Sequence, residues 1–276
     1  VPFIIRAFNQ KAGRIDVSLF GSTFLGYQAG NFNSGSANTA MGFRALRNNT
    51  SGTQNIAIGN EALSNNISGS VNVANGYYTL FSNISGSQNT GIGYQALVGN
   101  TAGNNNTAIG SLSLTNNKTG YSNVAIGAQA LRFSSDKSNL VAIGDSALYN
   151  NGQSSPLPWQ ATANTAIGSK ALFLNSNGSD LTATGYNTLY NNTSGVANAA
   201  YGSLSLQYNT TGSANAAFGF SSLETNQTGS YNTGIGAQAL RFNNGSQYNT
   251  ALGYRAANSY NIGWNNTVIG AEADVS

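Results

Sequence analysis

The sequence predicts an all-β fold, a parallel β-solenoid of about 15 coils in which each 17-residue unit forms one coil. Three observations support this prediction. A motif of the type Ala-Ile-Gly recurs at a constant spacing, short apolar segments alternate with polar ones, and the polar segments are rich in Asn, Ser and Gly. A unit this short cannot bury its own apolar face, so successive units are expected to stack.

The repeat is counted from its anchor glycine, the last residue of the Ala-Ile-Gly motif. The spacings between anchors are 16, then 17 six times, then 24, then 17 six times again. The 15 anchors are Gly26, Gly42, Gly59, Gly76, Gly93, Gly110, Gly127, Gly144, Gly168, Gly185, Gly202, Gly219, Gly236, Gly253 and Gly270. Coils stacked at ~4.8 Å along one axis predict a rod.

Each unit holds two short apolar segments, Thr-Ala-Ile before the anchor and x-Ala-Leu after it, followed by Asn-Asn-x-Ser-Gly. The Asn, Ser and Gly residues favour turns and interrupt helices. Short apolar segments bounded by turns are typical of strands, so both segments are predicted to be strands.

Four segments follow in chain order. Residues 1–20 lie outside the repeat and carry four of the 19 charged residues. We expect a hairpin or strand pair there that caps the first coil, and the alternative is a docking segment for a neighbouring protein. Coils 1–8 occupy 21–152, an inserted loop occupies 153–161, and coils 9–15 occupy 162–276.

The inserted loop contains Pro156, Pro158 and Trp159. Proline cannot donate to a strand ladder, so the segment is expected to leave the coil. An exposed tryptophan beside prolines is a candidate binding residue for a carbohydrate or a protein partner. The alternative is a Trp159 that folds back over apolar surface. Trp264, in a turn of the last unit, is also considered for binding, and it is equally placed to pack on a coil or a following domain.

Asparagine occupies the fourth position before the anchor (position −4) in 12 of the 15 units. Stacked at one position of every coil, these side chains are predicted to form a structural ladder of amides, each bonded to the next. The ladder residues are Asn38, Asn55, Asn72, Asn89, Asn106, Asn123, Asn164, Asn198, Asn215, Asn232, Asn249 and Asn266.

The apolar core is predicted to be thin. Each coil is expected to bury about one Ile, at position −1, and one Leu, at position +4, and small residues at −2 and +3 indicate close backbone approach. So little burial leaves a lone stack marginal. We therefore expect several chains to pack side by side and to bury one apolar row. The alternative is a monomer whose whole core lies within one coil.

Composition excludes several classes of site. The chain has no cysteine and no histidine, so Cys/His zinc sites and Ser-His-Asp or Cys-His nucleophiles cannot form. We expect no catalytic group, metal or cofactor. The net charge of +3 comes from scattered basic residues, which argues against nucleic acid as a partner. No apolar run approaches the ~18 residues of a membrane span, so direct membrane insertion is not expected.

Units such as 106–110 (Asn-Thr-Ala-Ile-Gly) and 123–127 (Asn-Val-Ala-Ile-Gly) resemble the head repeats of trimeric autotransporter adhesins, the YadA-like heads. The 17-residue form, as in 93–97 (Gly-Tyr-Gln-Ala-Leu), is closer to tail-fibre-like surface proteins of bacteria and phages, which often end in an intramolecular chaperone domain. The resemblance covers roughly 21–276 and implies left-handed coils, a homotrimeric rod, and an extracellular place on a bacterial surface or a phage tail fibre. No such chaperone domain is recognised in 21–276, and we expect the chain to be a fragment of a longer protein, or one whose end is covered by another chain.

The resulting functional hypothesis is a non-enzymatic fibre or adhesin segment that spaces and presents binding surfaces for a surface receptor or a glycan. One alternative is a tailspike-like polysaccharide depolymerase, which needs two carboxylates ~5–9.5 Å apart. The neighbouring pairs are Asp136 with Asp145 and Glu272 with Asp274. The other alternative is an ice-binding solenoid. Its candidate residues are the threonines at position −3, Thr39, Thr90, Thr107, Thr165, Thr233, Thr250 and Thr267.

Overall fold

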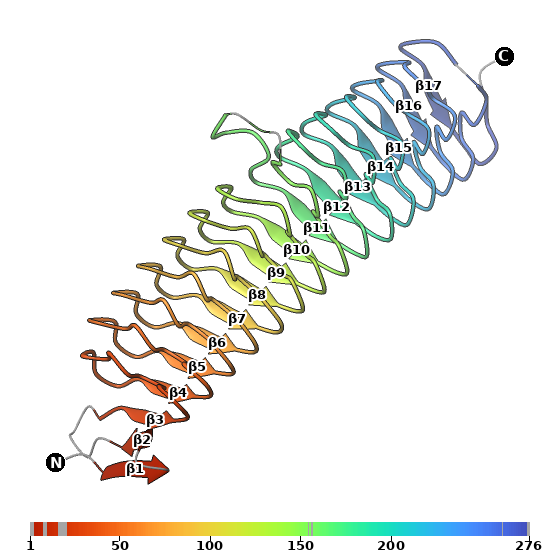
Figure 1. The fold of residues 1–276 in the computed structure, drawn as a ribbon. Helices are drawn as coiled ribbons and strands as arrows, with labels where there is room; N and C mark the ends of the chain where they lie inside the picture. Colours follow the sequence, from red (N-terminus) through yellow and green to blue (C-terminus); the bar gives the residue numbers. More distant parts are fainter. Residues whose placement is uncertain are drawn as a thin grey trace. The chain divides into compact units, whose positions relative to one another are not determined.

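The fold is an all-β parallel β-solenoid of about 14 turns with a 17-residue spacing. A computed structural model describes residues 3–7, 10–15, 21–153, 155, 157–260 and 262–274. These residues form strands and turns, and no helix occurs among them. The chain divides into two compact units, Val1–Ser138 and Asn139–Ser276, and each is taken in turn (Figure 1).

The first unit begins with an antiparallel hairpin of β1 (Phe3–Ala7) and β2 (Gln10–Ile15). Strand β2 then pairs antiparallel with the first strand of the repeat, Arg14 opposite Phe24. The hairpin thereby gives the edge of the first coil a hydrogen-bonded partner. Seven parallel strands follow, β3 (Thr23–Leu25), β4 (Thr39–Met41), β5 (Ile56–Ile58), β6 (Val73–Asn75), β7 (Thr90–Ile92), β8 (Thr107–Ile109) and β9 (Val124–Ile126).

The second unit contains only parallel strands of the repeat. Each pairs in register with the next, as Val141 does with Thr165 across the inserted loop. The strands are β10 (Val141–Ile143), β11 (Thr165–Ile167), β12 (Thr182–Thr184), β13 (Ala199–Tyr201), β14 (Ala216–Phe218), β15 (Thr233–Ile235), β16 (Thr250–Leu252) and β17 (Thr267–Ile269).

The number of coils differs slightly from the expected 15. Each of the 15 anchors does follow one parallel strand of the described chain. A complete turn of the solenoid runs from one strand to the next, however, so the strands β3 to β17 enclose about 14 complete turns. The last anchor, Gly270, is followed by only a few described residues.

Each coil has one strand rather than the two predicted. The segment after the anchor is a series of turns, because alternate residues take positive φ: in one coil Leu112 has φ 58° and Leu114 has φ 49°. Residues in the left-handed region reverse the local direction of the chain, so they cannot continue an extended strand. The segment still forms backbone hydrogen bonds with the same segment of the neighbouring coils. For example, Leu114 N–H donates to the carbonyl of Ala130 in the next coil over 2.9 Å.

The core of a coil consists of alanine and leucine. Ala108, at the centre of β8, and Leu114 are both fully buried, whereas Ile109 is 37% exposed. The prediction that the isoleucine row lies in the core is therefore wrong. Neighbouring residues of a strand face opposite ways, so the buried alanine at position −2 directs the residue at −1 outward.

The predicted asparagine ladder lies inside the coils. The side-chain nitrogen of Asn106 donates to the carbonyl of Gly120 in the same coil (2.8 Å) and to Oδ1 of Asn89 in the previous one (3.1 Å). Oδ1 of Asn106 accepts the backbone N–H of Asn123 in the next coil (3.1 Å). Each such amide closes its own coil and bonds to its neighbours, which satisfies the buried backbone without a second sheet.

A second buried asparagine row, at position +7, was not anticipated from the sequence. In the first unit, side-chain nitrogens donate to Oδ1 of the preceding residue of the row over 2.6–2.8 Å, as Asn100 does to Asn83. The row comprises Asn49, Asn66, Asn83, Asn100 and Asn117 in the first unit, and Asn151, Asn175, Asn192, Asn209, Asn226 and Asn243 in the second.

The anchor glycines lie directly above one another. Gly110 has φ 132°, and a Cβ built on it would lie 2.5 Å from the carbonyl oxygen of Gly127 in the next coil. Both features exclude a side chain, and this accounts for the anchor recurring as glycine in every unit.

The described parts of the chain contain no helix with the length and apolar character that a membrane crossing requires.

Candidate binding surfaces

The first unit exposes an apolar strip made of two rows, position −1 at the end of each strand and position +1 just after the anchor. Their large side chains are 36–49% exposed. Two ring pairs stack between neighbouring coils, Tyr27 on Phe43 and Tyr77 on Tyr94, each with 5.6 Å between ring centroids. The strip consists of Leu25, Tyr27, Met41, Phe43, Ile58, Tyr77, Ile92, Tyr94, Ile109 and Ile126.

The second unit exposes the same two rows. Tyr201 and Phe218 stack in the −1 row with ring centroids 4.8 Å apart. The apolar strip of this unit consists of Ile143, Ile167, Tyr186, Tyr201, Phe218, Phe220, Ile235, Leu252, Tyr254 and Ile269. The strip recurs in both units, and exposed apolar patches of this kind mark interaction sites.

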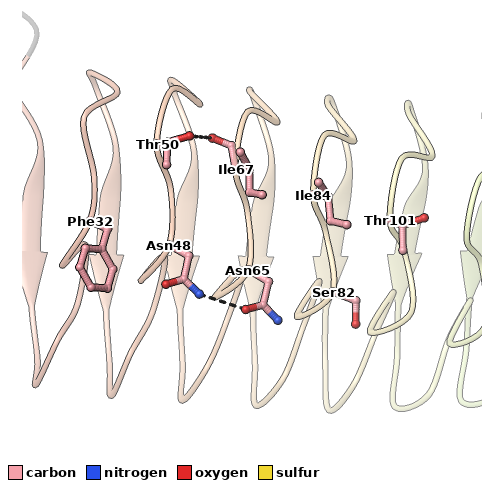
Figure 2. Close-up of a pocket in the computed structure, with 8 residues that line it drawn as sticks. All are labelled: Phe32, Asn48, Thr50, Asn65, Ile67, Ser82, Ile84 and Thr101. Carbon is pink, nitrogen blue, oxygen red and sulfur yellow. Dashed lines mark hydrogen bonds between the residues drawn. The ribbon is translucent and has the colours of Figure 1, made fainter.

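A groove of about 700 Å³ also runs along the turns of the first unit (Figure 2). Phe32, Ile67 and Ile84 supply its apolar lining. Two hydrogen bonds join neighbouring coils along it: the side chain of Asn48 donates to Asn65 Oδ1 (3.1 Å), and Thr50 Oγ1 donates to the carbonyl of Ile67 (2.9 Å), as the dashed lines in Figure 2 show. The groove follows successive turns of the repeat, whose side chains differ from coil to coil, as Asn48, Asn65 and Ser82 do.

The inserted loop leaves the coil in the second unit, and Trp159 in it is 67% exposed. The alternative in which this tryptophan folds back over the coils therefore does not apply. Pro158 is exposed as well, and Pro156 lies outside the described residues. Trp264, 62% exposed, belongs to a different turn and does not line the same groove as Trp159.

Trp159 borders a groove of about 480 Å³. Gln160 from the loop, Asn177 and Asp180 from the next coil, and Val196 from the coil after that line the rest of it. The groove combines one aromatic face with amide and carboxylate groups. Sequence reasoning singled out Trp159 but not Asn177 and Asp180, because these two residues come from the next coil, 18 and 21 residues further along the chain.

Of the acidic pairs considered for glycoside hydrolysis, Glu272 and Asp274 line one groove of about 360 Å³ together with Arg255. Ser259 donates a hydrogen bond to Asp274. Among the described residues no group of three or more His, Cys, Asp or Glu side chains could hold a metal ion.

The threonine row considered for ice binding lies at the first residue of the strands. Thr107 and Thr165 are half-buried, whereas Thr23 in the first parallel strand and Thr250 and Thr267 in the last two are exposed. The row is interrupted by apolar side chains such as Ile56 and Val73. It therefore presents no continuous array of hydroxyl groups.

Two sets of residues, the buried asparagine row at +7 and the apolar strip, were not identified from the sequence. The buried row at +7 had a usable signal, because asparagine occupies that position in every unit up to Gly236 except the one with Ser134. The apolar strip also had a signal in the aromatic residues at +1, such as Tyr77 and Tyr94, which are too large for a core built of alanine.

No family model matches the chain, and no curated protein sequence matches it. The repeat, the buried amides and the exposed surfaces therefore carry the functional argument.

Proposed function

We propose that the chain is a segment of a homotrimeric extracellular fibre with left-handed coils. It spaces and presents surfaces for attachment to a receptor or glycan, and it belongs to a bacterial surface or a phage tail fibre. The proposal includes no catalytic activity and no cofactor. The observation that carries it is the apolar strip, which repeats along both units.

The size of the strip supports burial by another chain. Aromatic side chains carry about 200 Å² each, so the four rings of the first unit alone leave roughly 350 Å² exposed. Six aliphatic side chains add to this area. Asn60, Asn75 and Ser111 interrupt the two rows with exposed polar side chains. Monomeric proteins rarely expose apolar patches much larger than a few hundred Å², so the summed area of the strip still favours an assembled state.

The repeat supports copies of the same chain as the partner. Every chain carries the strip with the same 17-residue spacing, so identical chains match it coil for coil. Cyclic symmetry places the same row of each chain around one axis and leaves no strip uncovered. Three copies are proposed because of the resemblance to trimeric adhesin heads, and the left-handed coil has the same basis.

The absence of cysteine from the sequence permits a direct test. Ile109→Cys places one thiol in the strip, and Thr119→Cys places one on an exposed turn of the same coil. We expect mild oxidation or a short bis-maleimide to link the Ile109→Cys chains into covalent dimers at nanomolar to micromolar protein. The Thr119→Cys chains should remain uncoupled. Equal coupling of both variants, or none of either, would contradict burial of the strip between copies.

A further inference from the structure

We propose that the groove beside Trp159 binds a neutral saccharide. The inference names a ligand class for the attachment function proposed above, and it rests on that function only for the biological role of the binding. The binding site itself lies within the second unit of one chain, so it does not depend on the strip or on the number of copies.

The loop is anchored so that Trp159 is presented in a fixed place. Its carbonyl oxygen accepts hydrogen bonds from Thr162 Oγ1 and Ser179 Oγ, each over 3.0 Å. The backbone N–H of Ala161 donates to the carbonyl of Asn177 over 3.2 Å, and the carbonyl of Ala161 accepts from the buried side chain of Asn151 over 2.8 Å. The backbone is thus tied to the coils while the indole stays exposed.

The other side of the groove offers polar groups. Asp180 is exposed, and its backbone N–H donates to the carbonyl of Thr162 over 3.2 Å, which fixes the residue against the loop. Oδ1 of Asn177 is buried and has no hydrogen-bond partner among the described residues. A buried acceptor of this kind is costly unless a donor from a ligand or water reaches it.

This combination suits a sugar ring. One face of a pyranose is apolar and stacks on an aromatic ring, while its edge carries hydroxyl groups that donate and accept hydrogen bonds. The indole of Trp159 supplies the stacking face, and Gln160, Asn177 and Asp180 supply the amide and carboxylate partners. The groove volume of about 480 Å³ falls within the range of small-molecule sites.

The lining argues against two other ligand classes. A single carboxylate, Asp180, and no basic side chain line the groove, so an anionic sugar gains no ion pair there. A purely apolar ligand would remove water from the exposed Asp180 carboxylate without replacing its hydrogen bonds, which costs free energy.

The test uses the intact chain and an array of neutral oligosaccharides built from hexoses and N-acetylhexosamines, followed by calorimetric titration of the strongest binder. Trp159→Ala should weaken binding by about tenfold or more, as loss of a central aromatic residue does. Asp180→Asn should weaken it less. The matched control is Trp264→Ala, which removes an equally exposed tryptophan outside the groove and should leave the affinity unchanged.

Binding that is lost in Trp159→Ala and retained in Trp264→Ala supports the inference. It is overturned if no neutral oligosaccharide binds at millimolar concentration, or if Trp159→Ala and Trp264→Ala bind the sugar equally. It is also overturned if choline, a cation that an indole and a carboxylate can hold, binds in place of the sugars. The molar mass of the native chain is measured on the same sample. A trimer without saccharide binding refutes only this inference, and a saccharide-binding monomer refutes only the proposed trimer.

Discussion

The side-chain amide of Asn106 donates to the carbonyl oxygen of Gly120 over 2.8 Å and closes the coil to which both residues belong. The same carbonyl also accepts the side chain of Asn117 over 3.0 Å, so the two asparagine rows meet at one acceptor. A coil with a single three-residue strand is thus held by buried amides as much as by apolar packing.

Removal of one ladder amide should destabilise the coil locally. Asn106→Ala leaves the buried N–H of Asn123 without its acceptor, and we expect a loss of about 2–3 kcal/mol. Hydrogen exchange of the peptides that span 107–125 measures the loss, because the solenoid is not expected to unfold in one step. Asn116→Ala, at an exposed position of the same coil, should leave exchange unchanged. Equal exchange in the two variants would show that the ladder contributes little.

A side chain at the anchor should be tolerated far less than one at an open glycine. Gly110→Ala combines φ 132° with a Cβ only 2.5 Å from the carbonyl oxygen of Gly127, so we expect a loss of about 3 kcal/mol or more, or failure to fold. Gly245→Ala has φ 82° and meets no atom nearer than 3.5 Å, so its loss should be about 1 kcal/mol. Hydrogen exchange of the peptides around each substitution measures the two losses, and equal losses of protection would contradict the close stacking of the anchors.

Completion of the second asparagine row should stabilise the first unit. The row is interrupted in the coil after Asn117, where Ser134 stands in place of asparagine. Ser134 Oγ and Asn117 Oδ1 are both buried, and neither has a hydrogen-bond partner among the described residues. Lys137, 1% exposed, occupies the position where most coils carry glycine, and its Nζ lies 3.6 Å from Asp136 Oδ1. The double variant Ser134→Asn/Lys137→Gly restores the consensus, and we expect a gain of about 1–2 kcal/mol from the new amide bond.

The two single variants complete a double-mutant cycle for this pair. Ser134→Asn alone should gain less than the double variant, because the buried Lys137 side chain remains in that coil. Hydrogen exchange of the peptides that span 117–140 measures the effect of each variant. Protection in the double variant at or below that of the native chain would show that the serine and the lysine form a better local arrangement than the consensus.

A charge in the apolar strip should dissociate the proposed assembly. Ile109→Asp brings one carboxylate from each chain toward the others in a low-dielectric contact, which opposes association. Sedimentation velocity should show a shift toward the monomer, while Thr119→Asp, on an exposed turn of the same coil, should sediment as the native chain does. An unchanged assembly in Ile109→Asp would place the contact elsewhere on the molecule.

Much of this fold can be predicted from the sequence, because a strict period fixes both the stacking and the register. The spacing of anchors such as Gly110 and Gly127 indicates parallel strands in register. What it does not fix is which apolar residue faces inward. Ile109 is more hydrophobic than Ala108, yet the interior of a coil with close backbones accommodates only the alanine, and Ile109 is left outside.

The local conformation after the anchor is also hidden from pattern reasoning. The segment with Leu112 and Leu114 alternates as a strand does, but positive φ at both leucines makes it a set of turns. Leucine has no preference for the left-handed region of positive φ, so the residue type does not predict these turns. The groove beside Trp159 could not be predicted from the sequence for another reason. Asn177 and Asp180 lie beside it only because successive coils stack.

The central claim is that copies of this chain cover the apolar strip, and the molar mass of the native chain in solution tests it most directly. Light scattering on the chromatographically pure protein should give a value near three times the 28.5 kDa of one chain. A mass near 28.5 kDa at micromolar concentration would contradict the account, because the strip would then remain exposed to water in the native state.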